Sequence, residues 1–294
     1  MDAANTQAEI KARIDGLLED VTQLPPMPAM VARLNALVQD PDVDMKALAD
    51  EISLDPAITA AIIRLSNSAF YRPSRAIRSV QEAIVTLGLR VVKNIVVVAA
   101  SKGILKVNLD DYKMEAPEMW DHSLAVAEIA ASIARIKKTS GVPEDVAFTA
   151  GLLHDIGKVV LVQHFHKVFL QIIADMEAQP GTSFTELERR YTGYSHDQVG
   201  GSLLERWGFP DELVEAVRYN YHPEQATVNP ALCSMVHVAN VIALSGGIGV
   251  DIGGLNEQLS GAALKTLELG DRELEALYGH LPEILEKLSD LRSL

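Results

Sequence analysis

The run from Trp120 to Arg135 constrains the fold most, because its sequence is strongly helical over the whole stretch. Its apolar and small residues cover much of the helical circumference, which is typical of a central helix. Hydrophobic residues make up 48% of the chain, whereas aromatic residues make up only 5%. This balance favours closely packed helices of Ala, Leu and Val over a β-sandwich. We therefore predict an all-α fold with this run as a central helix.

The chain length of 294 residues exceeds the usual size of a single hydrophobic core. We predict two helical lobes, with residues 1–116 as the N-terminal lobe and residues 117–245 as the second. Residues 246–294 would form a glycine-rich loop, from Gly246 to Gly254, that leads into a C-terminal helical tail.

Helix signals in the first lobe begin with an amphipathic pattern over residues 8–20 and a second one over 29–39. Between them, the prolines from Leu24 to Pro28 interrupt the chain. Further helices are predicted at residues that can cap an N-terminus, namely Asp44, Asp55 followed by Pro56, and Ser79. The stretch from Val91 to Leu105 is interpreted as a buried helix, although its β-branched residues are also compatible with a strand.

The second lobe carries a succession of helical patterns after the central helix. One leads up to His154, and the others are expected over residues 159–178, 183–191, 196–207, 211–221 and 231–245.

Charge and cysteine content exclude several function classes. The formal net charge of −14 argues against indiscriminate binding of DNA or anionic membranes, since phosphate contacts need a local excess of Lys and Arg. A single cysteine, Cys233, allows no internal disulfide and no Cys-rich zinc site, which fits a reducing cytoplasm. No apolar run reaches the roughly 20 residues of a membrane helix. We expect a soluble cytoplasmic protein.

The stretch from Gly151 to Lys158 places an imidazole, a carboxylate and an amine at the end of an apolar helix. His154 and Asp155 follow a helix whose apolar residues point to the core, so both side chains emerge from a buried surface. A buried carboxylate without a partner is costly, and a metal ion would relieve that cost.

Several motifs of the first lobe resemble the HDOD family, the HD-related output domains of bacterial signalling proteins. They are the segments Leu24 to Pro28, Asp55-Pro56, Leu65 to Ala69 and Ala83 to Gly88. The resemblance continues through the His-Asp stretch to about residue 245. It implies an all-helical fold and a role in signal transduction, whereas the family has no generally established reaction.

The resemblance to HD-type metalloenzymes also implies a set of metal ligands. The matching positions are His122, His154, Asp155, His196 and His222, with Asn240 standing where those enzymes carry an Asp. Imidazoles with a carboxylate suit iron, manganese, nickel or zinc better than calcium. The Gly-Tyr-Pro of the cyclic-di-GMP phosphodiesterases of this superfamily is absent after His222, which argues against that substrate. Each histidine could instead have a purely structural role.

Two further groups of charged residues each allow two interpretations. Lys158 could orient a phosphate as in the enzymes, or favour a helix C-terminus through the macrodipole. Basic residues dominate from Arg64 to Lys106, where Glu82 is the only acid. They could form ordinary solvated helix faces, or a surface that docks an acidic partner domain or a nucleotide through Arg64, Arg72, Arg75 and Arg78.

Two functions follow from these patterns. The first is a signalling module that acts through a protein partner and keeps a degenerate metal pocket, with little or no catalysis. The second is a metal-dependent phosphohydrolase in which Asp155 bridges two ions and Lys158 positions phosphate. Asn240 and the missing Gly-Tyr-Pro favour the first, and the five intact positions favour the second.

Overall fold

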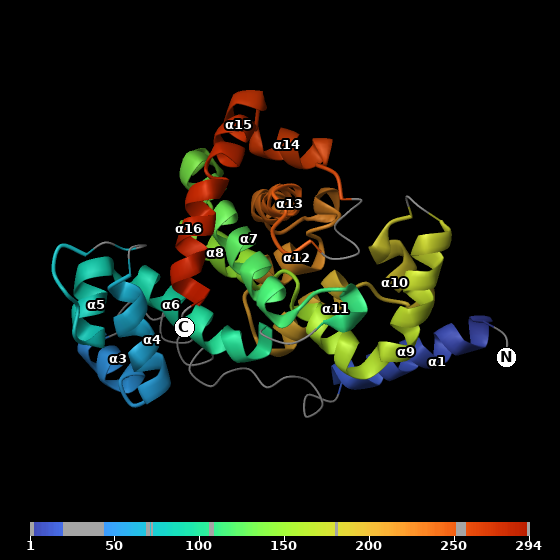
Figure 1. Cartoon of the computed structure of the whole chain (residues 1–294), viewed down its shortest axis with the longest axis horizontal. Helices are drawn as coiled ribbons and strands as arrows, with labels where there is room; N and C mark the ends of the chain where they lie inside the picture. The colour runs from blue at the N-terminus through green and yellow to red at the C-terminus, as the bar shows by residue number, and fades with distance from the viewer. Residues whose placement is uncertain are drawn as a thin grey trace. The chain divides into compact units, whose positions relative to one another are not determined.

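The computed structural model describes residues 3–19, 44–68, 71, 73–105, 109–179, 182–250 and 257–292. Their regular secondary structure is helical, and the β-pairing within these ranges is a single bridge between Leu109 and Met114. The all-α prediction is therefore confirmed (Figure 1). The predicted break from Leu24 to Pro28 and the helix over 29–39 lie outside the described residues.

Short connections join most of the helices. In chain order they are α1 (Ala3–Glu19), α3 (Met45–Ile52), α4 (Pro56–Ser66), α5 (Val80–Leu87), α6 (Leu89–Leu105), α7 (Ala116–Ile136), α8 (Glu144–Leu153), α9 (Ile156–Ala178), α10 (Phe184–Thr192), α11 (His196–Arg206), α12 (Asp211–Arg218), α13 (Pro230–Ser245), α14 (Gly261–Leu267), α15 (Asp271–Gly279) and α16 (Leu281–Arg292). Single 3-10 turns, η2 (Asp110–Tyr112), η3 (Lys138–Ser140) and η4 (Pro223–Gln225), lie between some of them. None of the described helices combines the length and the apolar character that crossing a bilayer requires.

The chain divides into two compact units by its internal contacts. The first unit comprises Met1–Pro26 and Leu105–Leu281, and the second comprises Met27–Ile104 and Pro282–Leu294. Helices α1, α14 and α15 thus group with the first unit. The predicted lobes, with boundaries at residues 116 and 245, are continuous stretches of the chain. The two units defined by packing each combine two separate stretches.

Helix α7 is the centre of the first unit, as predicted for the run from Trp120 to Arg135. It packs against α8 and α13, and its side chains from Met119 to Ala131 are all buried. Two glycines allow helices to approach closely. A Cβ atom on Gly151 of α8 would lie 2.8 Å from the Ala127 backbone of α7, and one on Gly157 of α9 would lie 1.9 Å from the carbonyl oxygen of His196.

Helix α1 belongs to the first unit, although residues 27–104, which come between α1 and the rest of that unit in the chain, belong to the second. It packs against α10 and α11 and buries Ile14 and Leu17. The Lys11 ammonium donates to the hydroxyl of Tyr194 at 3.1 Å, and that hydroxyl donates to Asp15 at 2.6 Å. The predicted amphipathic lead-in helix is therefore present.

The second unit confirms the predicted helix starts. The backbone N–H of Ile58 donates to Asp55 Oδ1 at 3.1 Å, and that of Glu82 donates to Ser79 Oγ at 3.1 Å. The stretch from Val91 to Leu105 lies in helix α6, with the side chains from Ile95 to Val98 buried. Burial of its apolar side chains outweighs the strand preference of the β-branched residues.

Candidate metal centre

The junction between α8 and α9 presents the His-Asp pair. Helix α8 ends at Leu153, and Asp155, whose φ of −103° and ψ of 9° are not helical, is the N-cap residue of α9. The side chains of His154 and Asp155 are fully buried. Lys158, one turn into α9, reaches back so that its Nζ lies 2.5 Å from Asp155 Oδ2. The predicted buried carboxylate thus has an ammonium partner, which reduces the cost of its burial.

Three imidazoles from different elements surround this carboxylate. The Nε2 atoms of His122 on α7 and His154 lie 3.8 Å and 3.3 Å from Asp155 Oδ2. On the other side, Nε2 of His196, the first residue of α11, lies 3.4 Å from Asp155 Oδ1. Donor atoms of His122, His154 and Asp155 all lie within 4.8 Å of one another, and the three residues form a group that could hold a metal ion.

The second ring nitrogen of each histidine is held by an acceptor oxygen. Nδ1 of His122 contacts the carbonyl of Ile248 at 2.9 Å, and Nδ1 of His154 contacts the carbonyl of Gly151 at 2.8 Å. A carbonyl oxygen only accepts, so both Nδ1 atoms carry the proton and both Nε2 atoms present a lone pair. Histidine ligands of metals are oriented in this way.

The pocket contains buried polar atoms that lack hydrogen bonds. Among the described residues, Nε2 of His154, Nε2 of His196 and Oδ1 of Asp155 have no hydrogen-bond partner. Buried polar atoms of this kind normally have one. Imidazole nitrogens and a carboxylate oxygen are the donors that divalent transition metals prefer, so these residues fit such an ion.

The pKa values of two pocket histidines, His122 and His196, shift in opposite directions. Burial lowers the pKa of His122 to about 4, so this ring is neutral. Burial alone would also lower the pKa of His196, but the carboxylates of Glu188 and Asp155 outweigh it and raise the pKa to about 10. Burial would raise the pKa of Asp155, yet His154 and Lys158 hold it well below its ordinary value.

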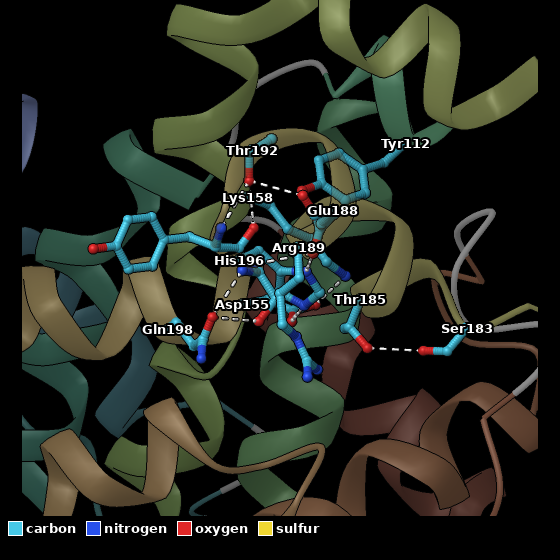
Figure 2. Close-up of polar contacts among 12 residues, drawn as sticks. Tyr112, Asp155, Lys158, Ser183, Thr185, Glu188, Arg189, Thr192, His196 and Gln198 are labelled. Atoms are coloured by element: carbon cyan, nitrogen blue, oxygen red, sulfur yellow. Dashed lines mark hydrogen bonds and ion pairs between the residues drawn. The ribbon is translucent and has the colours of Figure 1, made fainter. Parts of the chain in front are cut away.

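Glu188 is a part of the site that the sequence patterns did not reveal (Figure 2). It lies on α10, its side chain is fully buried, and its Oε2 lies 2.7 Å from Nδ1 of His196. Its Oε1 accepts the hydroxyl proton of Tyr112 at 2.6 Å. A signal was present, because Phe184, Leu187 and Tyr191 mark the apolar face of α10, and Glu188 falls on that face.

A family model for the HDOD domain matches residues 24–223, about two thirds of the chain. The chain belongs to the HDOD family. Among solved structures, an HDOD domain protein of unknown function from Geobacter sulfurreducens shares 25% identity, with 99% of this chain and 97% of that one covered and a TM-score of 0.75. A candidate phosphohydrolase from Shewanella amazonensis also shares 25% identity, with 92% and 98% covered and a TM-score of 0.65.

Two further proteins resemble this HDOD chain in fold or sequence. A candidate signal transduction protein from Marinobacter aquaeolei shares 24% identity, with 100% of this chain and 68% of that one covered and a TM-score of 0.76. An uncharacterized protein from Treponema pallidum is 22% identical over 234 residues, or 79% of this chain. The HDOD chain spans 44% of the length of that relative.

Neither His222 nor Asn240 takes part in the contacts that are described above for the HDOD pocket. His222 is half-buried, its Nε2 accepts from Arg189 Nη2 at 2.8 Å, and its Nδ1 lies 3.5 Å from Glu224. Asn240 is buried on α13, and its Oδ1 has no hydrogen-bond partner among the described residues. It lies beyond the segment that the HDOD model matches. Both assignments as ligands remain predictions.

The basic residues predicted to dock a partner belong to the second unit of the HDOD protein. Arg64, Arg75 and Arg78 are exposed, whereas Arg72 lies outside the described residues. Arg75 lies in the segment between α4 and α5, and Arg78 directly precedes the Ser79 cap. The side chain of Asn67 connects the two ends of this segment. It donates to the backbone carbonyl of Ile77 at 2.7 Å and accepts the backbone N–H of Ile77 at 2.8 Å.

Proposed function

We propose that this HDOD protein is a cytoplasmic signalling module that acts through protein partners and whose pocket binds one divalent transition metal ion. The observation that carries the metal site is the convergence of three Nε2 atoms, from His122, His154 and His196, on the single carboxylate of Asp155. Iron, manganese, nickel and zinc suit this donor set. A bound ion would supply a Lewis acid and a fixed connection between α7, α9 and α11.

Protein cations favour one ion over two. The ammonium of Lys158 already contacts Asp155 Oδ2, and the guanidinium of Arg189 already contacts the Nε2 of His222. A second ion would have to compete with both positive charges. Asn240 offers a neutral amide, which a divalent cation prefers less than a carboxylate.

A metal-dependent phosphohydrolase is the second candidate function. The likeness to the candidate phosphohydrolase from Shewanella amazonensis supports it, together with the placement of Lys158 beside Asp155. In such an enzyme the ammonium of Lys158 would orient a phosphate group, and Asp155 would hold the ions. Lys158 is buried and paired, so it would first have to release Asp155.

Metal content and hydrolysis distinguish the two functions. Protein purified without chelator is expected to hold about one equivalent of metal, measured by elemental analysis. With added Mn²⁺ or Fe²⁺ it should hydrolyse cyclic dinucleotides and simple phosphodiesters far more slowly than about 1 s⁻¹, the lower end of ordinary enzyme turnover. Two equivalents of metal with turnover at or above that rate would support the phosphohydrolase instead.

Asn240→Asp is expected to tighten metal binding by about 10-fold or more, because a carboxylate adds the negative charge that the amide lacks and changes around a metal site typically alter affinity by about 10–100-fold. Isothermal titration with Mn²⁺ measures the shift. Asn220→Asp is a matched control, since Asn220 is also buried, its Oδ1 has no hydrogen-bond partner within the described ranges, and it has no predicted role as a ligand. Equal affinities of wild type and Asn240→Asp would remove Asn240 from the ligand set.

The double variant Arg75→Glu, Arg78→Glu tests the docking surface. We expect it to abolish binding of an acidic partner domain while thermal stability stays within about 0.5 kcal/mol, because exposed substitutions rarely change stability more. The control Lys265→Glu reverses an exposed charge on α14 in the first unit. Binding that survives the double reversal would place the docking surface elsewhere.

A further inference from the structure

We propose that Tyr112 and Glu188 are positioning residues of the metal centre, which fix the ring of His196 and make it a stronger metal donor than the other two histidines. This inference rests on the proposed metal site. It goes beyond that site by assigning a role to Glu188, which contacts His196 directly, and to Tyr112, which contacts Glu188 from the segment between Leu109 and Met114.

Glu188 holds His196 through two hydrogen bonds to one carboxylate oxygen. Oε2 accepts the backbone N–H of His196 at 3.0 Å and faces its Nδ1 at 2.7 Å. The first bond fixes the start of α11, and the second fixes the rotation of the ring. Nε2 is thereby directed at Asp155 Oδ1, which lies 3.4 Å away.

Tyr112 completes the hydrogen bonding of Glu188. Its hydroxyl donates to the remaining oxygen, Oε1, at 2.6 Å, so both oxygens of this fully buried carboxylate are engaged. The phenol ring cannot swing away, because it packs against Phe169 and Phe184 with centroids at 4.9 Å and 5.2 Å. Its position thus fixes that of Glu188 and, through it, that of His196.

The partner of Nδ1 distinguishes His196 from the other histidines. His122 and His154 contact neutral carbonyl groups, whereas His196 contacts a carboxylate. A carboxylate partner makes an imidazole a more basic ligand. Its charge also attracts a doubly charged ion through the ring, in a buried setting where screening by water is weak.

Tyr112 lies where the chain returns to the first unit. Tyr112 ends the 3-10 turn η2, which lies where the chain re-enters the first unit after residues 27–104. The Leu109–Met114 bridge closes the turn, with Lys113 in the left-handed region at φ 54°. His166 of α9 contacts the Asp111 carboxylate within the same turn. A displacement of this segment would therefore alter the support of His196.

Cobalt titration of the full chain tests the proposal. Co²⁺ affinity is expected to fall about 10-fold in Tyr112→Phe, which loses only a hydroxyl, and about 10–100-fold in Glu188→Gln, which keeps an acceptor but loses the charge. The control is Tyr191→Phe. Tyr191 lies on α10, the helix that also carries Glu188, and its hydroxyl donates to the carboxylate of Asp175. The substitution therefore removes a comparable hydrogen bond that does not involve Glu188. Its cobalt affinity should equal that of wild type.

Proton NMR of the cobalt-loaded protein supplies a second readout. Wild type should show three strongly shifted ring N–H signals, one for each histidine ligand, and Tyr112→Phe and Glu188→Gln should both move the signal of His196 selectively. Wild type that binds no cobalt would overturn the metal site and this proposal together. Cobalt binding with unchanged affinity and an unmoved His196 signal in both variants would overturn the positioning role alone.

Discussion

Asp155→Asn is expected to weaken metal binding by more than about 100-fold. Asp155 is the only carboxylate in the described group of possible ligands, and three imidazole nitrogens lie within 3.8 Å of its oxygens. Residues that merely orient a ligand already contribute about 10–100-fold, so loss of a central charged ligand should exceed that range. Competition between the protein and a chelator of known affinity for Mn²⁺ would measure the effect.

The same substitution should also destabilise the fold, because it leaves the ammonium of Lys158 buried without its carboxylate. Breaking a buried ion pair from one side costs about 3–5 kcal/mol. The double variant Asp155→Asn, Lys158→Met is the matched control. It should regain most of the stability in denaturant unfolding while metal binding stays lost. Tight metal binding by Asp155→Asn would show that the ion sits elsewhere.

Gly157→Ala is expected to destabilise the first unit by about 3 kcal/mol or more. An added Cβ would lie 1.9 Å from the carbonyl oxygen of His196 and 2.6 Å from the backbone nitrogen of Gly200. Backbone atoms cannot rotate away, so α9 and α11 would have to separate, and insertions into tight packing typically cost about 1–3 kcal/mol even where side chains can adjust. The separation would also carry His196 away from Asp155 and weaken metal binding.

Gly16→Ala is the control for this prediction. Gly16 also lies in a helix, but nothing lies within 4 Å of the position of its Cβ. There the substitution should stabilise the protein by about 0.5–1 kcal/mol, because Ala is the better helix former. Denaturant midpoints of both variants provide the comparison. If Gly157→Ala were as stable as wild type, the close approach of α9 and α11 would not be required.

Sequence patterns predicted those parts of the fold that depend on neighbouring residues. The caps at Asp55 and Ser79 are local hydrogen bonds, and the residues that make them are close in the chain. Helix α6 was ambiguous from sequence, since its β-branched stretch from Ile95 to Val98 suits a strand as well. Its helical state depends on tertiary packing, which the propensities of its own residues do not predict.

The site was predictable only where its members are contiguous. His154 and Asp155 are adjacent in the sequence. His122 lies 32 positions before His154 and His196 lies 41 positions after Asp155, so only the family resemblance connected these two histidines with the pair. Glu188 was missed because a glutamate beside two arginines reads as part of a solvated helix face. Its burial follows from the docking of α10 on α9, a tertiary contact that composition does not reveal.

Helix α1 has a consequence for the order of synthesis and folding. Its Lys11 bonds Tyr194, which lies 183 residues later, so the surface that receives α1 does not exist when the ribosome makes the helix. Because translation adds roughly 5–20 residues per second, α10 and α11 are synthesised about 10–40 s after α1. During that interval the apolar side chains of Ile14 and Leu17 have no native partner from these helices, and a chaperone that recognises such stretches would have time to bind them.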